Sequence, residues 1–305
     1  MRAFHNKIKF HLLSLGRKNI SIKDKVKFNL IDLSVGRGGD IRKWAKLGFK
    51  QVLGIDLSIN NIILESPPDQ ENSITGARER FAELENQDNT RTREWYNQNA
   101  DTVKFLVGDT SKKMYIDTGE KTQDSDKIVK IANMCSGIDN SEKWRKEYEE
   151  YLATSGNNHM RRFGTAVSFF TIHYLFNTQE KVENFFKNAS DNLMLNGYLL
   201  ITCFDGQAVF EALKKNAFDT LKGYAKNKSG GEDKVWEIKA TYKEKLKKLS
   251  ELPYSIEKGF NNKISIMFKS ISDKHLEESL VHPVLLITMA YKFGFELAPV
   301  NEIKN

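Results

Sequence analysis

Short apolar runs alternate with amphipathic stretches along the first part of the chain. Residues 27–33 predict a buried strand, the glycines at 36–39 a tight turn, and residues 40–47 a helix. Residues 51–56 predict a second strand, and residues 59–64 begin another helix. Because strand, turn, helix and strand form a βαβ unit, we expect a parallel sheet.

The same pattern continues, interrupted by long polar segments. Further strands are predicted at 103–107, 165–170 and 198–204, and further helices at 178–193, 207–216 and 283–293, with a turn at Asn196-Gly197. Within the polar segments we expect helices near 125–135 and 141–152, and an antiparallel pair of strands at 235–242 and 263–269. The polar segments therefore read as insertions into an α/β core.

Composition narrows the class of protein. With 305 residues and 40% hydrophobic side chains, the chain can bury one main core. Its two cysteines lie far apart and indicate neither a disulfide framework nor a zinc site. No run reaches the roughly 18 consecutive apolar residues of a membrane span, so we expect no membrane and a cytoplasmic location. The net charge of +7 favours a polyanionic partner.

The glycine-rich turn carries the strongest chemical signal. Residues 32–40 read Asp-Leu-Ser-Val-Gly-Arg-Gly-Gly-Asp, between a predicted strand and a predicted helix. Glycines let the backbone approach a ligand, and the helix start offers unpaired N–H groups, so a nucleotide-like cofactor fits there. Asp56 follows Gly36 by 20 residues and can accept hydrogen bonds from both ribose hydroxyls. Dinucleotides and S-adenosylmethionine both use such a turn, but Ser34 and the glycines after it depart from the dinucleotide fingerprint.

The turn also resembles the first motif of a known enzyme family. That motif is D-L-G-x-G-K-G-G-D, followed by a helix that ends in a K-W pair, here Lys43 and Trp44. The family's F-N-N-W-I-K, Q-F-x-x-H-Y and P-G-G-Y elements, and a late segment with a guanine-binding glutamate, are similar to residues 4–9, 169–174, 196–198 and 275–286. The chain thus resembles the mRNA cap guanine-N7 methyltransferases. Residues 76–78, 107–109 and 202–206 look closest to the capping enzymes of large DNA viruses.

This resemblance implies a fold, a reaction and a cofactor. The fold would be a class I S-adenosylmethionine-dependent methyltransferase, a Rossmann-like α/β fold with a mostly parallel sheet, helices on both faces and insertions. We expect a single cap methyltransferase domain over residues 1–305, with a core at about 20–215 and insertions at about 65–101, 112–160 and 217–270. The methyl group of S-adenosylmethionine would pass to N7 of the GpppN cap of mRNA, in line and without a general base or a metal.

The resemblance also implies roles for individual residues. Those expected to bind the cofactor are Lys9 at its carboxylate, Gly36 and Gly38 at its methionine portion, Asp56 at its ribose and Asp109 at its adenine, together with Asp32 and Phe169. Phe170 would stack on the guanine and Glu278 would accept its N1 and N2 hydrogens. The remaining residues expected at the cap are His173, Tyr174, Asn6, Lys43 and His282.

Several of these residues have a plain structural alternative or depart from the family. Lys9 could be one lysine of a basic helix, Phe170 a core residue and Glu278 a solvated charge on a helix. Ser34 replaces a glycine and Phe169 a glutamine, which puts one cofactor contact in doubt. His282 stands where the family commonly has tyrosine.

Two other functions remain open from the sequence. One is a methyltransferase of a small molecule or a protein, which would keep the cofactor residues and make no use of Glu278. The other is a non-catalytic RNA-binding subunit of a capping complex, against which intact Asp56 and Asp109 argue. Capped mRNA is the expected substrate, and triphosphatase or guanylyltransferase domains or other capping subunits are candidate partners. If the protein is viral, a viral factory or the virion is the expected location.

Overall fold

The computed structural model describes residues 2–18, 28–63, 75–121, 127–131, 133–154, 163–227, 229–269 and 272–299. The chain divides into two compact units, each described here by itself. Unit 1 comprises residues 1–7, 170–183 and 202–297, and unit 2 comprises residues 8–169, 184–201 and 298–305. Several predicted elements reach into stretches outside the described residues, among them the start of the strand predicted at 27–33 and part of the insertion at 65–101.

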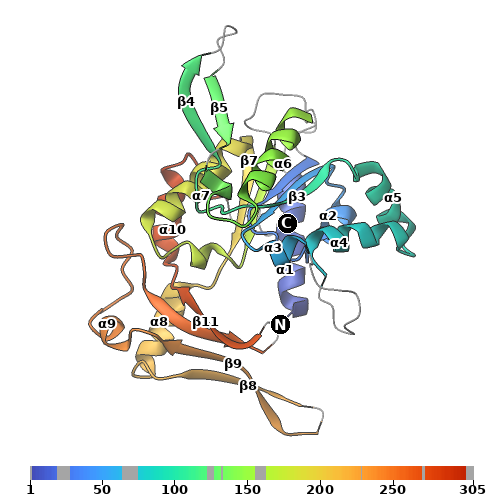
Figure 1. The fold of residues 1–305 in the computed structure, drawn as a ribbon. Coiled ribbons are helices and arrows are strands. Elements are labelled where there is room, and N and C mark those ends of the chain that lie inside the picture. Colours follow the sequence, from blue (N-terminus) through green and yellow to red (C-terminus); the bar gives the residue numbers. More distant parts are fainter. Residues whose placement is uncertain are drawn as a thin grey trace. The chain divides into compact units, whose positions relative to one another are not determined.

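Unit 2 is built around a five-stranded sheet with the order β3-β2-β1-β6-β7 (Figure 1). Its strands are β1 (Asn29–Asp32), β2 (Gln51–Asp56), β3 (Val103–Val107), β6 (Phe163–Phe169) and β7 (Leu193–Thr202). The pairs β1–β2, β2–β3 and β1–β6 are parallel. Strands of a parallel sheet are covered on both faces, so their sequences are largely apolar. In β6, for example, all seven residues are buried. The predicted fold class is therefore confirmed.

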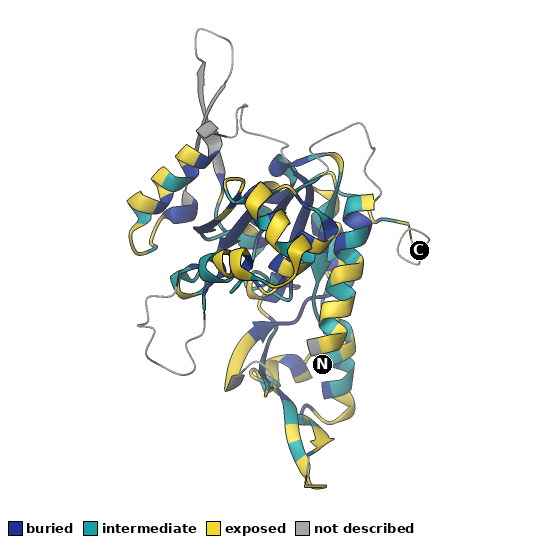
Figure 2. Ribbon diagram, turned by 90° about the vertical axis from the view of Figure 1, so that its right-hand side faces the viewer, coloured by how far each residue is buried: buried dark blue, intermediate teal, exposed yellow. Residues whose placement is uncertain are grey.

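Helices and a hairpin complete unit 2. The helices are α1 (Arg2–Lys18), whose first residues belong to unit 1, α2 (Ile41–Leu47), α3 (Ile59–Ile62), α4 (Ala77–Ala82), η2 (Glu83–Asn86), α5 (Thr90–Asn99), η3 (Asn133–Cys135), α6 (Ser141–Thr154) and α7 (Gln179–Asn192), which the two units share. The hairpin consists of β4 (Tyr115–Lys121) and β5 (Lys127–Ile131). Figure 2 shows buried strands beneath helices whose outer faces are exposed, as amphipathic patterns require.

Unit 1 contains an antiparallel sheet with the order β11-β10-β9-β8. Its elements are η4 (Ile172–Tyr174), α8 (Gly206–Lys215), β8 (Leu221–Lys226), β9 (Glu232–Ala240), α9 (Lys243–Lys247), β10 (Lys263–Phe268), β11 (Ser272–Ser279) and α10 (Pro283–Tyr291). Its core includes Phe210 and Leu213 of α8 packed with Ile238, Ile264 and Ile266 of the sheet. The antiparallel pairing of the strands predicted at 235–242 and 263–269 is confirmed as β9 with β10.

Three local predictions were wrong. The helix expected near 125–135 contains strand β5, because its Lys-Ile-Val-Lys-Ile sequence is rich in β-branched residues and pairs with β4. The turn expected at Asn196-Gly197 lies within β7, where Asn196 adopts a φ of 62°. The alternative in which Glu278 is a solvated charge on a helix is also wrong, because Glu278 lies on β11 and is buried. None of the helices in the described ranges is long and apolar enough to cross a bilayer.

Candidate functional site

The glycine-rich turn connects β1 to α2 in unit 2 and is tied to the sheet by backbone hydrogen bonds. Leu33 N–H donates to the Val167 carbonyl at 2.9 Å, and Val35 N–H donates to the Ile55 carbonyl at 2.9 Å. Gly36 adopts a φ of 54°, which disfavours other residues, and a Cβ placed on it would meet none of the described atoms within 4 Å. The turn therefore leaves open space beside its backbone, where a ligand can approach.

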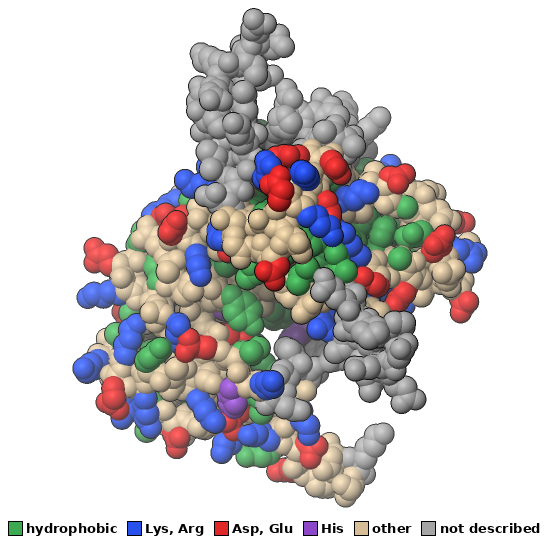
Figure 3. Space-filling model, in the orientation of Figure 1, with side chains coloured by type: hydrophobic (Ala, Val, Ile, Leu, Met, Phe, Trp, Pro, Cys, Tyr) green, Lys and Arg blue, Asp and Glu red, His purple; other side chains and the backbone are tan. Residues whose placement is uncertain are grey.

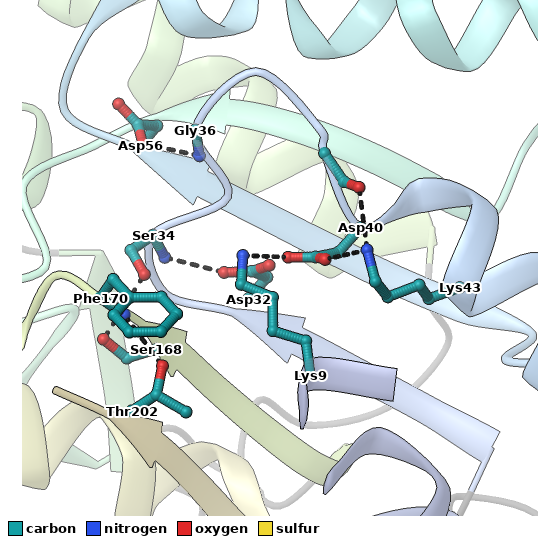
Figure 4. A network of polar contacts seen from close by, with 11 residues as sticks. Lys9, Asp32, Ser34, Gly36, Asp40, Lys43, Asp56, Ser168, Phe170 and Thr202 are labelled. Carbon is teal, nitrogen blue, oxygen red and sulfur yellow. Dashed lines mark hydrogen bonds and ion pairs between the residues drawn. The ribbon is translucent and has the colours of Figure 1, made fainter. Parts of the chain in front are cut away.

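Asp56, at the end of β2, is held by three N–H donors, of which Figure 4 shows Gly36. One carboxylate oxygen accepts from Gly36 N–H at 2.9 Å. The other accepts from Ser58 N–H and from the Asn61 side-chain amide, each at 2.9 Å. Because a carboxylate offers about four lone-pair sites, this one is fixed in orientation and can still accept from a ligand hydroxyl.

Two further acids lie along the same turn. Asp40 accepts salt bridges from Lys9 at 2.9 Å and from Lys43 at 2.7 Å (Figure 4). Asp32 is 3% exposed and accepts a hydrogen bond from Ser34 N–H at 3.0 Å. Burial, and after it the negative charge of Asp40, raises the pKa of Asp32 to about 8. The Asp32 carboxyl thus carries a proton at neutral pH.

The end of β3 and the end of β6 supply the other residues expected at the cofactor. Asp109 accepts from Ser111 N–H at 3.0 Å and from Ser111 Oγ at 2.5 Å, and Lys112 Nζ lies 3.9 Å from its carboxylate. Phe169 is buried, with Lys9 Nζ 5.3 Å from its ring centroid. All seven residues expected at the cofactor therefore belong to unit 2, around the carboxyl ends of parallel strands.

Three residues expected at the cap form a polar cluster in unit 1, in which His173 and Glu278 are buried and Tyr174 is 45% exposed. Tyr174 donates a hydrogen bond to Glu278, and Nε2 of His173 lies 3.4 Å from Glu278 Oε1. Burial raises the pKa of Glu278 to about 7 and lowers that of His173 to about 4, so the histidine is neutral at physiological pH. Burial also raises the pKa of Tyr174 to about 12.

This cluster has unused hydrogen-bonding capacity. His173 is 5% exposed, and among the described residues neither of its ring nitrogens has a hydrogen-bond partner. Glu278 is 8% exposed. Among the described residues, no lysine or arginine forms a salt bridge with its carboxylate. Such groups cost folding free energy unless a ligand satisfies them, so the cluster is suited to a polar planar ligand.

Phe170 follows β6 and has a strained backbone. Its φ is 59°, an unusual value for a bulky residue, and its N–H donates to the Thr202 carbonyl at 2.8 Å (Figure 4). Its ring lies 4.5 Å, centroid to centroid, from the ring of His5 and 6.3 Å from that of Phe204. Strain held by surrounding contacts is typical of ligand-binding positions.

The other residues expected at the cap differ from this group. Asn6 is exposed on α1. His282 caps the N-terminus of α10, where its Nδ1 accepts from Val284 N–H at 3.1 Å. Lys43 belongs to unit 2 and is engaged by Asp40, whereas the rest of the expected cap residues belong to unit 1. A local structural role is thus visible for His282 and for Lys43.

Sequence reasoning missed three residues that the structure places at these positions. Asp40 was quoted in the motif without a role, yet it pairs with both Lys9 and Lys43. Asn61 orients Asp56, and its position five residues later on α3 gave no signal by itself. His5 lies against Phe170, and the only hint was that it replaces an asparagine of the family's first element.

A family model matches nearly the whole chain. Residues 1–302 match the model of the mRNA (guanine-N(7))-methyltransferase domain. A probable mRNA-capping enzyme of Acanthamoeba polyphaga mimivirus is 27% identical over 214 residues, which cover 70% of this chain. The chain spans only 14% of the length of that viral protein.

Solved methyltransferase structures also resemble the chain at low sequence identity. The CcbJ methyltransferase from Streptomyces caelestis is 13% identical, with 96% of this chain and 86% of that chain covered and a TM-score of 0.48. An S-adenosylmethionine-dependent methyltransferase from Clostridium acetobutylicum is 10% identical, with 91% and 82% covered and a TM-score of 0.41.

Proposed function

Because this chain belongs to the mRNA (guanine-N7)-methyltransferase domain family, we propose that Phe170, His173, Tyr174 and Glu278 position the cap guanine while the turn after β1 holds the methyl donor. Family membership confirms the predicted enzyme class and S-adenosylmethionine as the cofactor. The observation that carries the residue assignment is the polar cluster of Glu278, His173 and Tyr174, in which both ring nitrogens of the buried His173 have no hydrogen-bond partner among the described residues.

The residues around the turn fit the cofactor. The open space beside Gly36 would accommodate the methionine portion, and Asp56 has about one lone-pair site left for a ribose hydroxyl. Asp109 would accept from the adenine amino group, Asp32 would border the donor, and Lys9 would exchange its pairing with Asp40 for the cofactor carboxylate. Gly38 and Phe169 would complete the wall of this site.

The unit 1 cluster fits a guanine edge. An ionised Glu278 can accept from two neighbouring N–H donors, an arrangement that guanine offers at N1 and N2. The Phe170 ring provides a face for stacking, which strengthens as methylation makes the base cationic. Asn6, Lys43 and His282 remain assigned to the cap only by the family resemblance.

The chemistry requires positioning more than acid or base catalysis. The cofactor supplies an activated methyl group on a positively charged sulfur. N7 of guanine has a lone pair and no proton, so no residue needs to remove one. By orienting the base, Phe170 and Glu278 would hold N7 in line with the methyl group, and orientation of this kind can lower a barrier by roughly 7–11 kcal/mol.

We also propose a domain organisation, partners and a location for the protein. The chain would act as a single cap methyltransferase domain, which the match over residues 1–302 supports. Triphosphatase and guanylyltransferase partners are suggested by the mimivirus relative, a probable mRNA-capping enzyme much longer than this chain. A cytoplasmic site of action, in a viral factory or otherwise, is proposed on the same relationship.

Two alternatives make different demands on the same residues. A methyltransferase of a small molecule or protein would bind S-adenosylmethionine but would not discriminate guanine through Glu278. A non-catalytic RNA-binding subunit would leave Asp56 without a cofactor. Binding of the cofactor, measured by titration, separates the second alternative from the proposal, and methylation of GpppN-ended RNA separates the first.

The decisive experiment is methylation of capped RNA with radiolabelled S-adenosylmethionine, followed by nuclease digestion to identify 7-methylguanosine. Asp56→Ala and Glu278→Ala should abolish or sharply reduce that product. Glu277→Ala is the matched control for Glu278, because Glu277 is the neighbouring, more exposed acid of β11 and pairs with Lys263. Full activity in both test variants would refute the proposed site.

A further inference from the structure

The positive charge of the chain is concentrated in one segment of unit 1. Residues 214–248 contain eleven lysines and five acidic residues, an excess of six. The whole chain has an excess of seven, so the remaining residues together contribute an excess of one. The segment covers the end of α8, the hairpin of β8 and β9, and α9. A lysine excess confined to one part of a chain is the electrostatic footprint of a polyanion-binding surface.

Some lysines of this segment are already neutralised by neighbouring acids. Lys234 and Lys239 both pair with the buried Glu237, at 2.7 and 2.5 Å, and Lys247 pairs with Glu244 at 3.1 Å. His275 Nε2 also lies 3.1 Å from Oε1 of Glu237. These lysines stabilise the sheet and are less able to bind a ligand.

Other lysines of the segment are exposed and unpaired. Among the residues that the structure describes, no salt bridge or side-chain hydrogen bond involves four exposed lysines, namely Lys215, Lys222, Lys226 and Lys248. Figure 3 shows lysine and arginine side chains gathered over the part of the molecule that carries β8, β9 and α9. Their charges are therefore available to an external partner.

An exposed aromatic residue accompanies these lysines. Tyr224 is 55% exposed and lies on β8 two residues before Lys226, so the two side chains share a face of the strand. Tyr242, at the N-terminus of α9, is 49% exposed. A cation beside an exposed aromatic ring is the pattern that binds single-stranded nucleic acid, with phosphates on the lysines and bases stacked on the ring.

A simpler explanation for lysine on β8 is protection of the sheet edge. Edge strands commonly carry lysine to prevent pairing with another chain. That explanation accounts for the lysines of β8 but not for Tyr224, an exposed aromatic ring between Lys222 and Lys226 on the same face of the strand.

We propose that the outward-facing side chains of β8, Lys222, Tyr224 and Lys226, bind the single-stranded RNA chain that follows the cap. This inference rests on the proposed function, because it extends the substrate from the cap to the RNA attached to it. RNA is favoured over an acidic protein because Tyr224 offers a stacking face next to a cation. The surface would recognise phosphates and bases without sequence specificity.

The test compares binding and methylation in two charge-matched variants of the full chain. The test variant is Lys222→Glu/Lys226→Glu, and the control is Lys104→Glu/Lys146→Glu, which alters an exposed lysine of edge strand β3 and one of α6. Binding of an uncapped, fluorescein-labelled 20-nucleotide RNA is measured by anisotropy at several salt concentrations. Methylation is measured on the dinucleotide GpppA and on a capped 20-nucleotide RNA. Thermal unfolding confirms that each variant folds.

The expected result is weaker RNA binding in the test variant only. Loss of two phosphate contacts should reduce the slope of log K against log salt concentration by about 1.4. KM should rise for capped RNA while methylation of GpppA stays at the wild-type level. Tyr224→Ala should weaken binding by roughly fivefold or more, with an unchanged salt slope.

Three results would overturn the inference. They are unchanged RNA binding in the test variant, an equal loss in the control, and binding of poly-glutamate as tight as that of RNA, which would indicate an acidic protein partner. If the test variant failed to unfold cooperatively, Lys222→Gln/Lys226→Gln would replace it and must weaken RNA binding. Failure of the proposed function appears separately, as absence of GpppA methylation by the wild-type protein.

Discussion

Replacing Glu278 by glutamine should stabilise the folded protein and inactivate it. Burial raises the pKa of Glu278 from 4.5 to about 7, so the folded protein binds a proton more tightly than the unfolded chain does. Unfolding therefore releases a proton between about pH 4.5 and 7, and the folded state loses stability as the pH rises through that window. Each pKa unit corresponds to about 1.4 kcal/mol, which gives a penalty of about 3 kcal/mol above pH 7.

Glu278→Gln removes this penalty, because glutamine has the same shape and no charge. At pH 8 the free energy of unfolding should rise by up to about 3 kcal/mol, and the gain should shrink as the pH falls towards 5. Activity should be lost, since an amide cannot accept from both guanine donors. Urea unfolding at pH 5 and pH 8, with a cap methylation assay, measures both effects.

Glu277→Gln is the control for the same experiment. Glu277 lies next to Glu278 on β11, is exposed and pairs with Lys263 of β10, so its replacement should change stability little. The reasoning is refuted if Glu278→Gln lowers stability at pH 8, because the buried carboxylate would then be a structural contact. It is also refuted if the variant keeps wild-type activity.

Four further expectations follow from other residues. Asp56→Asn should weaken S-adenosylhomocysteine binding at least tenfold in calorimetry, because hydrogen bonds to a charged acceptor contribute about 1.5–3 kcal/mol each. Phe170→Gly should be about 1 kcal/mol more stable to urea than Phe170→Ala, since only glycine tolerates a φ of 59° without strain, and both variants should lose activity. NMR titration should find His173 uncharged down to about pH 5, because burial lowers its pKa to about 4; protonation near pH 6.5 would contradict this. Because the pKa of Asp32 is raised to about 8, binding of the positively charged S-adenosylmethionine at pH 7 should release part of a proton, visible as buffer-dependent heat that Asp32→Asn abolishes.

The sequence was sufficient for the parallel sheet because its strands are largely apolar runs. Each of β1, β2, β3 and β6 is mostly buried and bounded by turn residues, so the hydrophobic pattern located them. The antiparallel sheet was harder. β8 has a mostly exposed surface, with Leu221 and Gly223 as its partly buried positions, and so it lacked an apolar signal. β11 was missed for a similar reason, since Leu276 is exposed on a strand of charged residues.

Sequence order could name the site residues but not their neighbours. Phe170, His173 and Tyr174 are close in sequence; the strand was predicted to end at Phe170, and His173 and Tyr174 were predicted to follow it. Glu278 lies more than 100 residues after His173 and Tyr174 in the sequence. Its contact with them depends on the pairing of β11 with β10. No local pattern encodes such a contact. The backbone strain at Phe170 likewise arises from its surroundings, because nothing in the residue itself favours a positive φ.

Three acids assigned by the same resemblance occupy different electrostatic environments. Asp56 receives three N–H donors, which fix it as an acceptor for hydroxyl groups. Asp32 and Glu278 are buried with fewer donors, so burial dominates and their pKa values rise to about 8 and about 7. A charged ligand near Asp32, or a pair of N–H donors at Glu278, would favour ionisation of each. Ligand binding should therefore change the protonation of Asp32 and Glu278, which the sequence alone does not reveal.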